Sequence, residues 1–244
     1  MAGGNAVVLD DPVGASLRGH HAHLARGHGG AVTYLPGVAT FSAVPAGAGP
    51  AEWADLTRLL GQGEFADLFD CPSIPPSHWE SVFVLEGRQM IWPGPGSRVP
   101  SQAEARTGMV EARAGMVELG PGDVPEMLDL AGRTQPGPFW ARTLELGTYL
   151  GIRDKDTLVA MAGERLRPPG WTEISAVCTA PEARGRGYAA RLVSALAGRI
   201  VSRDERPFLH VADTNTAAIA LYERLGFEAR KPVTFRGFRT PVSS

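Results

Sequence analysis

The sequence predicts a mixed α/β fold in which helices pack on a sheet. The segment 172–179 is rich in β-branched and apolar residues, is typical of a strand, and ends just before Pro181. A glycine-containing turn follows, and apolar residues then recur at helical spacing at positions 189, 192, 193, 196 and 200. Because another strand, helix and strand follow in alternation, the pattern predicts one sheet covered by helices.

The first 92 residues also combine helical and strand-like segments. Trp53, Leu56, Leu59 and Leu60 share one face of a helix that we predict over residues 51–60. The other elements predicted in this half are a helix at 12–25, strands at 31–34 and 39–43, and a strand at 79–85 that turns at 86–88 into residues 89–91.

The segment 92–101 is the clearest break in the chain, because its three prolines and two glycines oppose both helix and central strand. It separates an N-terminal α/β domain predicted at 1–105 from a second domain predicted at 115–244. Next along the chain we expect a connecting helix or strand at 102–110, a strand at 115–119, and a helix that begins with a capping box at Asp123 and runs through Leu130. Two strands, at 148–152 and 157–164, should follow, joined by a turn at 153–156.

The composition limits the possible functions. The chain has 244 residues, of which 43% are hydrophobic and 20% charged, as is typical of a globular protein. Its formal net charge of −2 offers no basic surface to nucleic acid. Two cysteines, Cys71 and Cys178, indicate no disulfide framework, and no apolar run approaches the length of about 18 residues that a membrane helix needs. We therefore expect a cytoplasmic monomer or homodimer without nucleic-acid or membrane partners.

The turn that precedes the predicted helix, Arg184–Ala189, has the composition of a phosphate-binding loop. Its two glycines let a ligand approach the backbone, and the helix N-terminus supplies N–H donors and the positive end of the helix dipole. Its two arginines add positive charge. The segment Arg26–Ala31 has the same R-x-x-G-x-A spacing but lacks a strand before it and a helix after it, so we do not expect it to bind phosphate.

Two further stretches accompany this loop. The strand-like Phe208–Val211 comes next, and Asn215–Phe227 fits the pattern N-x-x-A-x-x-L-Y-x-x-x-G-F. In this order and spacing the three stretches resemble the GCN5-related N-acetyltransferase (GNAT) superfamily, over about Val117 to Phe238. The resemblance implies the GNAT fold, an α/β (α+β) fold whose mixed, mostly antiparallel sheet has a splayed central strand pair and flanking helices. The FR47-like and glycine N-acyltransferase-like relatives place a degenerate α/β half before this domain.

The resemblance also implies a function: an acetyl-CoA-dependent N-acetyltransferase that acts on the primary amine of an unidentified acceptor. The amine would attack the thioester directly in a ternary complex, with no covalent enzyme intermediate and no metal. The strand, the loop and the residue that caps the next helix would hold the cosubstrate. The residues expected to bind it are Val177, Cys178, Thr179, Arg184, Gly185, Arg186, Gly187, Tyr188, Ala189 and Asn215.

Acyl transfer to an amine needs a proton acceptor for the ammonium group and a proton donor for the thiolate. By resemblance, Glu173 is the base and Tyr222 the acid, and burial is expected to raise the pKa of Glu173. An ion pair or a solvated strand end is the alternative for Glu173, and core packing is the alternative for Tyr222. Strand alternation places Glu173, Ser175 and Val177 on one face unless a bulge intervenes. His210 is the reserve base, and a hydrogen-bonded core histidine is its alternative.

Other chemistries are open at this stage. Cys178 could carry an acyl group, but no base accompanies it in the sequence, so we expect a buried thiol. Four of the six histidines, His20, His21, His23 and His28, lie close together but match no zinc motif, so we expect a solvated or substrate-side cluster without metal. The alternative functions are a CoA-binding sensor without catalysis, a histidine–metal protein, and an acyltransferase for longer acyl-CoA donors.

Overall fold

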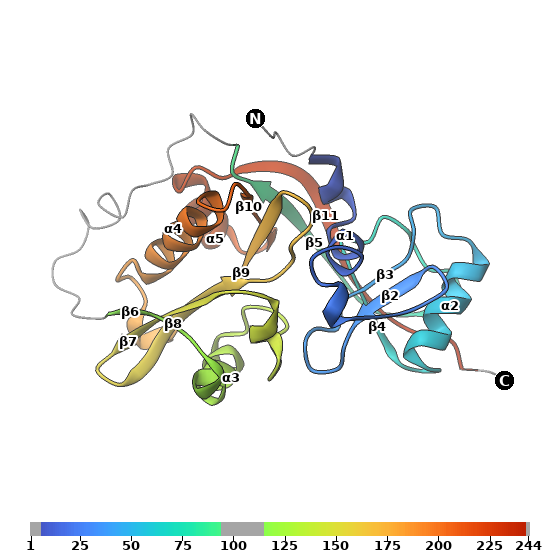
Figure 1. The fold of residues 1–244 in the computed structure, drawn as a ribbon, viewed down its shortest axis with the longest axis horizontal. Helices are drawn as coiled ribbons and strands as arrows, with labels where there is room; N and C mark the ends of the chain where they lie inside the picture. The colour runs from blue at the N-terminus through green and yellow to red at the C-terminus, as the bar shows by residue number, and fades with distance from the viewer. Residues whose placement is uncertain (1–5, 94–114, 243–244) are drawn as a thin grey trace.

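The computed structural model describes residues 6–93 and 115–242, which are organised around one eight-stranded sheet (Figure 1). The strand order is β4-β11-β5-β10-β9-β8-β7-β6, and all neighbours pair antiparallel except β9 and β10. This confirms the predicted mixed, mostly antiparallel sheet. The strands are β4 (Phe65–Phe69), β5 (Glu80–Ile91), β6 (Met116–Glu118), β7 (Tyr149–Asp154), β8 (Thr157–Glu164), β9 (Trp171–Thr179), β10 (Arg206–Ala212) and β11 (Glu228–Arg239).

Helices cover both faces of one half of this sheet. Figure 1 shows α3 on one side of β7–β9, and α4 with α5 on the other side. Their apolar faces bury residues such as Met127, Leu192 and Leu196 in the largest hydrophobic cluster, where burial of apolar surface stabilises the fold. The helices are α3 (Val124–Thr134), α4 (Tyr188–Val201) and α5 (Thr216–Arg224).

The N-terminal half adds a second, three-stranded sheet with the order β1-β2-β3. It consists of β1 (Ala25–His28), β2 (Ala31–Tyr34) and β3 (Ser42–Ala43), and it is accompanied by α1 (Pro12–Leu17) and α2 (Pro50–Leu60). The segment Arg26–Ala31 forms the β1–β2 hairpin, with no helix after it, which agrees with the expectation that it is not a phosphate loop.

The two halves of the chain share one sheet. Strand β5 comes from the first half, yet it pairs with β10 on one side and with β11 on the other. A hydrophobic cluster also joins Leu9 and Val13 to Trp171 and Phe208. The division into domains at 1–105 and 115–244 stays a prediction, but the hydrogen bonds of β5 cross it.

Several sequence expectations were wrong in detail. Residues 86–88 do not turn, because they pair with β11 within the continuous strand β5. The first helix ends at Leu17, two residues before a glycine, a weak helix former. Asp123 does not cap α3, because its carboxylate accepts the Gly120 N–H at 2.8 Å, and the helix runs on to Thr134. Strands β1 and β4 were not predicted, and the expected element at 102–110 lies outside the described residues.

Candidate active site

The two central strands separate at the middle of the sheet. The parallel pairing of β9 with β10 extends only from Trp171 and Arg206 to Glu173 and Phe208. Beyond this point residues 174–179 and 210–212 line the two sides of a cavity of about 410 Å³. The predicted splayed strand pair is therefore confirmed, and it opens a cleft at the centre of the molecule.

A β-bulge shapes the β9 wall of this cavity. Ala176 has a φ of 52°, and the register with β8 shifts between the pairs Met161–Cys178 and Gly163–Ser175. Left-handed backbone costs a non-glycine residue about 1–2 kcal/mol, and such strain gathers at functional sites. The bulge interrupts the alternation of the strand, so the simple expectation that Glu173, Ser175 and Val177 share one face does not hold through this point.

The predicted loop lies where α4 begins beside the cavity. Gly185 and Gly187 have φ values of 77° and 74°, and a Cβ on either would meet no atom within 4 Å. No side chain caps α4, and Arg184 and Arg186 are exposed, so the first N–H groups and the positive helix end are available to an anion. Ala189, in the first turn of the helix, lines the cavity.

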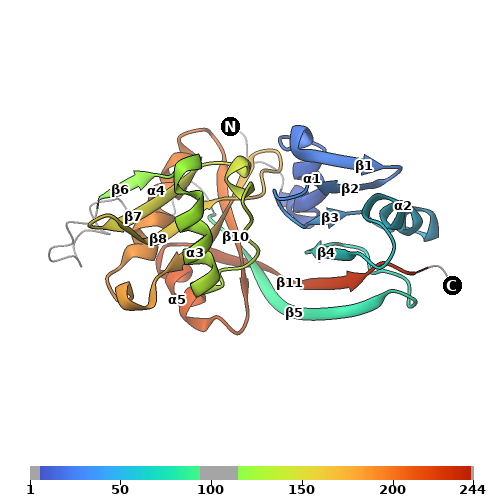
Figure 2. The ribbon, with the colours of Figure 1, turned by 90° about the horizontal axis from the view of Figure 1, so that it is seen from below.

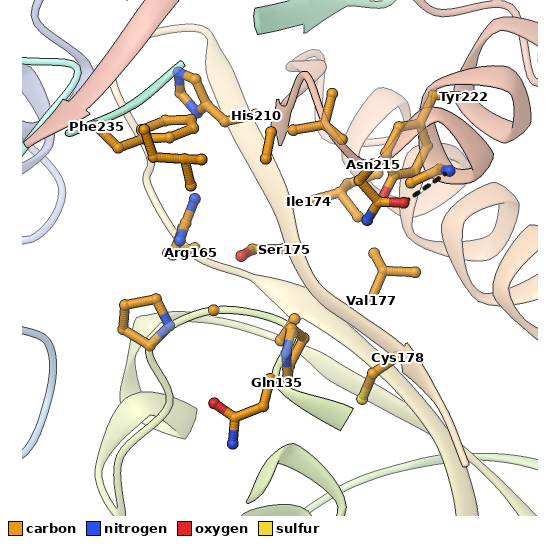
Figure 3. A pocket seen from close by; sticks show the side chains of 18 of the residues that line it. Gln135, Arg165, Ile174, Ser175, Val177, Cys178, His210, Asn215, Tyr222 and Phe235 are labelled. Carbon is orange, nitrogen blue, oxygen red and sulfur yellow. Dashed lines mark hydrogen bonds between the residues drawn. The ribbon is translucent and has the colours of Figure 1, made fainter. Parts of the chain in front are cut away.

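Tyr222 and Asn215 line the same cavity from α5. Figure 3 shows them close together, with Val177 and Cys178 toward the same end, whereas Arg165, His210 and Phe235 lie toward the other end. Asn215 accepts the Ala218 N–H at 3.2 Å, so the predicted helix cap is confirmed. Burial raises the pKa of Tyr222 to about 12, so its hydroxyl keeps its proton at neutral pH.

Glu173 lies behind the cavity wall, fully buried. Its carboxylate accepts hydrogen bonds from Arg165 Nε at 2.8 Å and Nη2 at 2.6 Å, and lies 2.6 Å from His210 Nδ1. Burial acts to raise the pKa of Glu173, but the positive charges and hydrogen bonds of Arg165 and His210 outweigh it and lower the pKa to about 2. The expectation of a raised pKa is wrong, because the sequence could not show these partners.

His210 connects Glu173 with the N-terminal half. Its Nε2 atom lies 3.4 Å from Asp70 Oδ2, and its side chain is 1% exposed. Burial lowers the pKa of His210, but the carboxylates of Glu173 and Asp70 reverse this effect and raise it. Lys231 bonds Asp70 in turn at 3.1 Å, so the ion-pair network extends from β9 to β11. His210 is thus a buried, hydrogen-bonded histidine.

The remaining candidates have ordinary partners. Burial raises the pKa of the Cys178 thiol, as expected for a buried cysteine. His21 lies 2.9 Å from the Tyr34 hydroxyl, and burial lowers its pKa to about 4. His20 lies near Arg167, and His28 lies near Asp55. Residues 6–93 and 115–242 contain no group of three side chains suited to hold a metal.

Sequence reasoning missed the residues at the far end of the cavity. Arg165 follows β8, with its guanidinium carbon 4.4 Å from the centre of the Phe69 ring, and Phe69 stacks on Phe235 at 4.7 Å. Asp67 lines the cavity on β4. These residues come together only through strand pairing between distant segments, and β4 carried no strand signal because Asp67 interrupts its apolar run.

Comparison with known proteins defines the class of the chain. Residues 149–235 match the family model of FR47-like proteins. A crystal structure from Novosphingobium aromaticivorans, assigned to the GNAT family of acetyltransferases, is 38% identical, covers 96% of this chain and 99% of its own, and has a TM-score of 0.82. The fold is therefore that of an acetyltransferase. This chain belongs to the GNAT family.

More distant relatives agree on the fold. A GCN5-related N-acetyltransferase-like protein of Streptococcus suis is 16% identical, with 96% of each chain covered and a TM-score of 0.64. A GCN5-related N-acetyltransferase of Kribbella flavida is 18% identical, with the same coverage and a TM-score of 0.62. An uncharacterized protein of Mycobacterium leprae is 40% identical over 83 residues, which span 33% of this chain and 23% of that protein. In the described part of the chain, no helix is long and apolar enough to cross a membrane.

Proposed function

We propose that the protein transfers an acetyl group from acetyl-CoA to a primary amine. The observation that carries this proposal is the cleft between β9 and β10, which has a bulge on one wall and the uncapped N-terminus of α4 beside it. An extended thioester could follow the open strand edge while its diphosphate meets the helix end. The amine would attack the thioester directly within a ternary complex.

The residues of the cleft have separate tasks in this proposal. The backbone N–H groups of the loop bind the diphosphate, and the bulged strand and the Asn215 side chain hold the pantetheine arm. The residues proposed for these contacts are Val177, Cys178, Thr179, Arg184, Gly185, Arg186, Gly187, Tyr188, Ala189 and Asn215. A backbone N–H near the bulge would polarise the thioester carbonyl, which is where negative charge develops.

Tyr222 is proposed as the acid. As the amine nitrogen forms its bond to the acyl carbon, the carbon–sulfur bond breaks and the Tyr222 proton goes to the thiolate. The proton that the nitrogen loses in becoming an amide returns to the Tyr222 oxygen. The assignment of Glu173 as the base stays a prediction. Because the pKa of Glu173 is lowered to about 2, its carboxylate accepts a proton poorly near neutral pH. Its contacts support a positioning role toward Arg165 and His210.

The first test is thermal unfolding with CoA, acetyl-CoA and longer acyl-CoA donors. A ligand at about 100 times its dissociation constant should stabilise the protein by about 2.7 kcal/mol. The variant Arg184→Ala/Gly187→Trp should lose this shift, because it disturbs the loop alone. No shift with any donor would contradict the proposal, and a larger shift with a longer donor would identify a different acyl group.

The second candidate is a CoA-binding sensor without catalysis, and the fully paired Glu173 carboxylate is the observation that favours it. Release of free thiol from acetyl-CoA in a screen of amines separates the two functions. An enzyme should turn over, and Tyr222→Phe should lower kcat while the thermal shift with acetyl-CoA remains. A sensor should bind the donor and release no thiol with any amine.

A further inference from the structure

The end of the cavity away from α4 is built by residues from both halves of the chain. Strands β4 and β5 lie on either side of β11 and extend beyond the helix-covered part of the sheet (Figure 2). The residues that line this end include Asp67, Phe69, Phe83, Leu85, Arg165, His210 and Phe235. If the proposed acetyl-CoA site is at the α4 end, this is the space left for the acceptor.

The wall of this end is an apolar surface open to a ligand. Phe235 pairs directly with Phe69 on β4 and with Leu85 on β5, so the three side chains share one face of the sheet. Two residues further along β11, Gly237 pairs with Asp67 on β4 and with Phe83 on β5. A Cβ at Gly237 would collide with the Phe83 ring, so the glycine makes room for this ring. Phe83 and Leu85 are each 40% exposed. This surface suits an aromatic or branched apolar group.

Asp67 supplies the one carboxylate among the described residues that line the cavity. Its side chain is nearly inaccessible, and its Oδ2 atom accepts a hydrogen bond from the Thr40 hydroxyl at 2.8 Å. Within residues 6–93 and 115–242 it forms no ion pair, whereas the nearby Arg165 is already paired with Glu173. A buried carboxylate without an ion-pair partner is costly, so the cationic group of a ligand would be a favourable partner for Asp67.

The protonation state of Asp67 suits proton transfer near neutral pH. Burial raises the pKa of Asp67 to about 6, against the smaller opposing effects of the Thr40 hydrogen bond and the Arg165 charge. On its own strand, the flanking Ala66 and Leu68 and the same-face Phe65 and Phe69 carry no charge. Its partner on β11 is Gly237, and the charge that acts on Asp67 is that of Arg165. By contrast, Glu173 is held ionised by its partners, and Tyr222 keeps its proton.

We propose that Asp67 binds the ammonium group of the acceptor and takes its proton, and that the acceptor is a primary amine on an aromatic or branched apolar group. This inference rests on the proposed function. One N–H proton of the ammonium group passes to the Asp67 carboxylate, which frees the nitrogen lone pair. The nitrogen then forms its bond to the acyl carbon, the carbon–sulfur bond breaks, and the thiolate takes the Tyr222 proton. The second proton that the nitrogen must lose to become an amide returns to the Tyr222 oxygen and restores its hydroxyl.

The test compares amines and variants in the full-length protein with acetyl-CoA. Initial rates are measured with 2-phenylethylamine, ethylamine, phenylalanine and spermidine. We expect kcat/KM to be highest for 2-phenylethylamine, by about tenfold or more over ethylamine. Asp67→Asn should lower kcat/KM by about 10²- to 10⁴-fold and remove the activity loss below about pH 6. The matched control, Asp129→Asn on the exposed face of α3, should leave both unchanged.

Phe83→Ala provides a second variant, because it should reduce the preference for 2-phenylethylamine over ethylamine. The inference is overturned if Asp67→Asn keeps the wild-type rate and pH profile, or if ethylamine or spermidine is the better acceptor. If one of these results is found while Asp67→Asn keeps the thermal shift with acetyl-CoA, the donor site is intact and only the inference about the acceptor site is wrong. A wild-type protein that binds no acyl-CoA overturns the proposed function, and this inference with it.

Discussion

Glu173 and Asp67 are both buried carboxylates, but their pKa values shift in opposite directions, because the partners of Glu173 outweigh the effect of burial and those of Asp67 do not. Arg165 and His210 contact Glu173 and hold it ionised. Asp67 has one hydrogen-bond partner, the Thr40 hydroxyl, and the nearby Arg165 is already paired with Glu173. The sequence shows an acidic residue in a strand in both cases. Which carboxylate can exchange a proton depends on partners that are far away in the chain.

The buried ion pair between Glu173 and Arg165 predicts an effect on the free energy of unfolding. Glu173→Gln should lower the free energy of unfolding by about 3–5 kcal/mol, because Arg165 would remain buried without its counter-charge. Arg165→Met/Glu173→Gln should be less destabilised than the single variant, since it buries no unpaired guanidinium. Urea unfolding measures both, with Glu223→Gln on the exposed surface of α5 as the control. A Glu173→Gln protein as stable as the wild type would contradict this reading of the pair.

Asp67 predicts a dependence of stability on pH with a definite sign. Its pKa rises from 3.8 to about 6 on folding, so the folded state binds the proton more tightly than the unfolded state. The contribution of Asp67 to the free energy of unfolding is fully present below about pH 4 and is lost as the pH rises through 6. The loss amounts to at most about 3 kcal/mol. Asp67→Asn should therefore be more stable than the wild type at pH 7.5 and equal to it near pH 4. Thermal melts at both pH values check this.

At the scale of elements, the glycine loop and the bulge are the two local irregularities that shape the cleft. The loop could be predicted, because strand, glycine turn and helix follow one another in sequence. The bulge at Ala176 could not, since alanine gives no signal for a left-handed backbone. Strand β5 was misread as a hairpin because Glu86-Gly87-Arg88 is a typical turn sequence, whereas pairing with β10 and β11 keeps it continuous.

Two glycine substitutions in or beside α4 should have opposite effects. Gly187→Ala should destabilise the protein by about 1–2 kcal/mol, because its φ of 74° strains an alanine although the space around it is open. Gly198→Ala, inside the same helix and exposed, should stabilise it by up to about 1 kcal/mol. Thermal unfolding gives both values. If the proposed donor site is right, only Gly187→Ala also weakens the shift with acetyl-CoA.

On the scale of the whole molecule, the sequence pattern predicted the sheet and the resemblance to the GNAT family predicted its splayed centre, but neither showed how the halves join. The sequence break at 92–101 indicated separate domains, whereas the pairing of β5 with β10 and β11 carries one sheet across that break. Long-range pairing of this kind has no local signal. For the same reason the acceptor-side residues, which come from both halves, could not be assembled from sequence.

The shared sheet predicts that the halves depend on each other. A fragment of residues 115–244 would lack β5 and expose an edge of both β10 and β11 along with the apolar surface beneath. We expect this fragment to lose cooperative unfolding and to aggregate, while the full chain unfolds in one transition. Circular dichroism melts and size-exclusion chromatography compare them. An independently folded, monomeric fragment would restore the two-domain interpretation.

The sheet order also has a consequence for synthesis on the ribosome. Strand β5 ends at Ile91, but its two neighbours, β10 and β11, begin only at Arg206 and Glu228. Until those strands are made, the continuous apolar run from Val82 to Leu85 has no strand to pair with and is open to pairing with other nascent chains. Folding of this protein should therefore be completed only after β10 and β11 have left the ribosome, and its yield in cells should depend on chaperones that shield β5 in the interval.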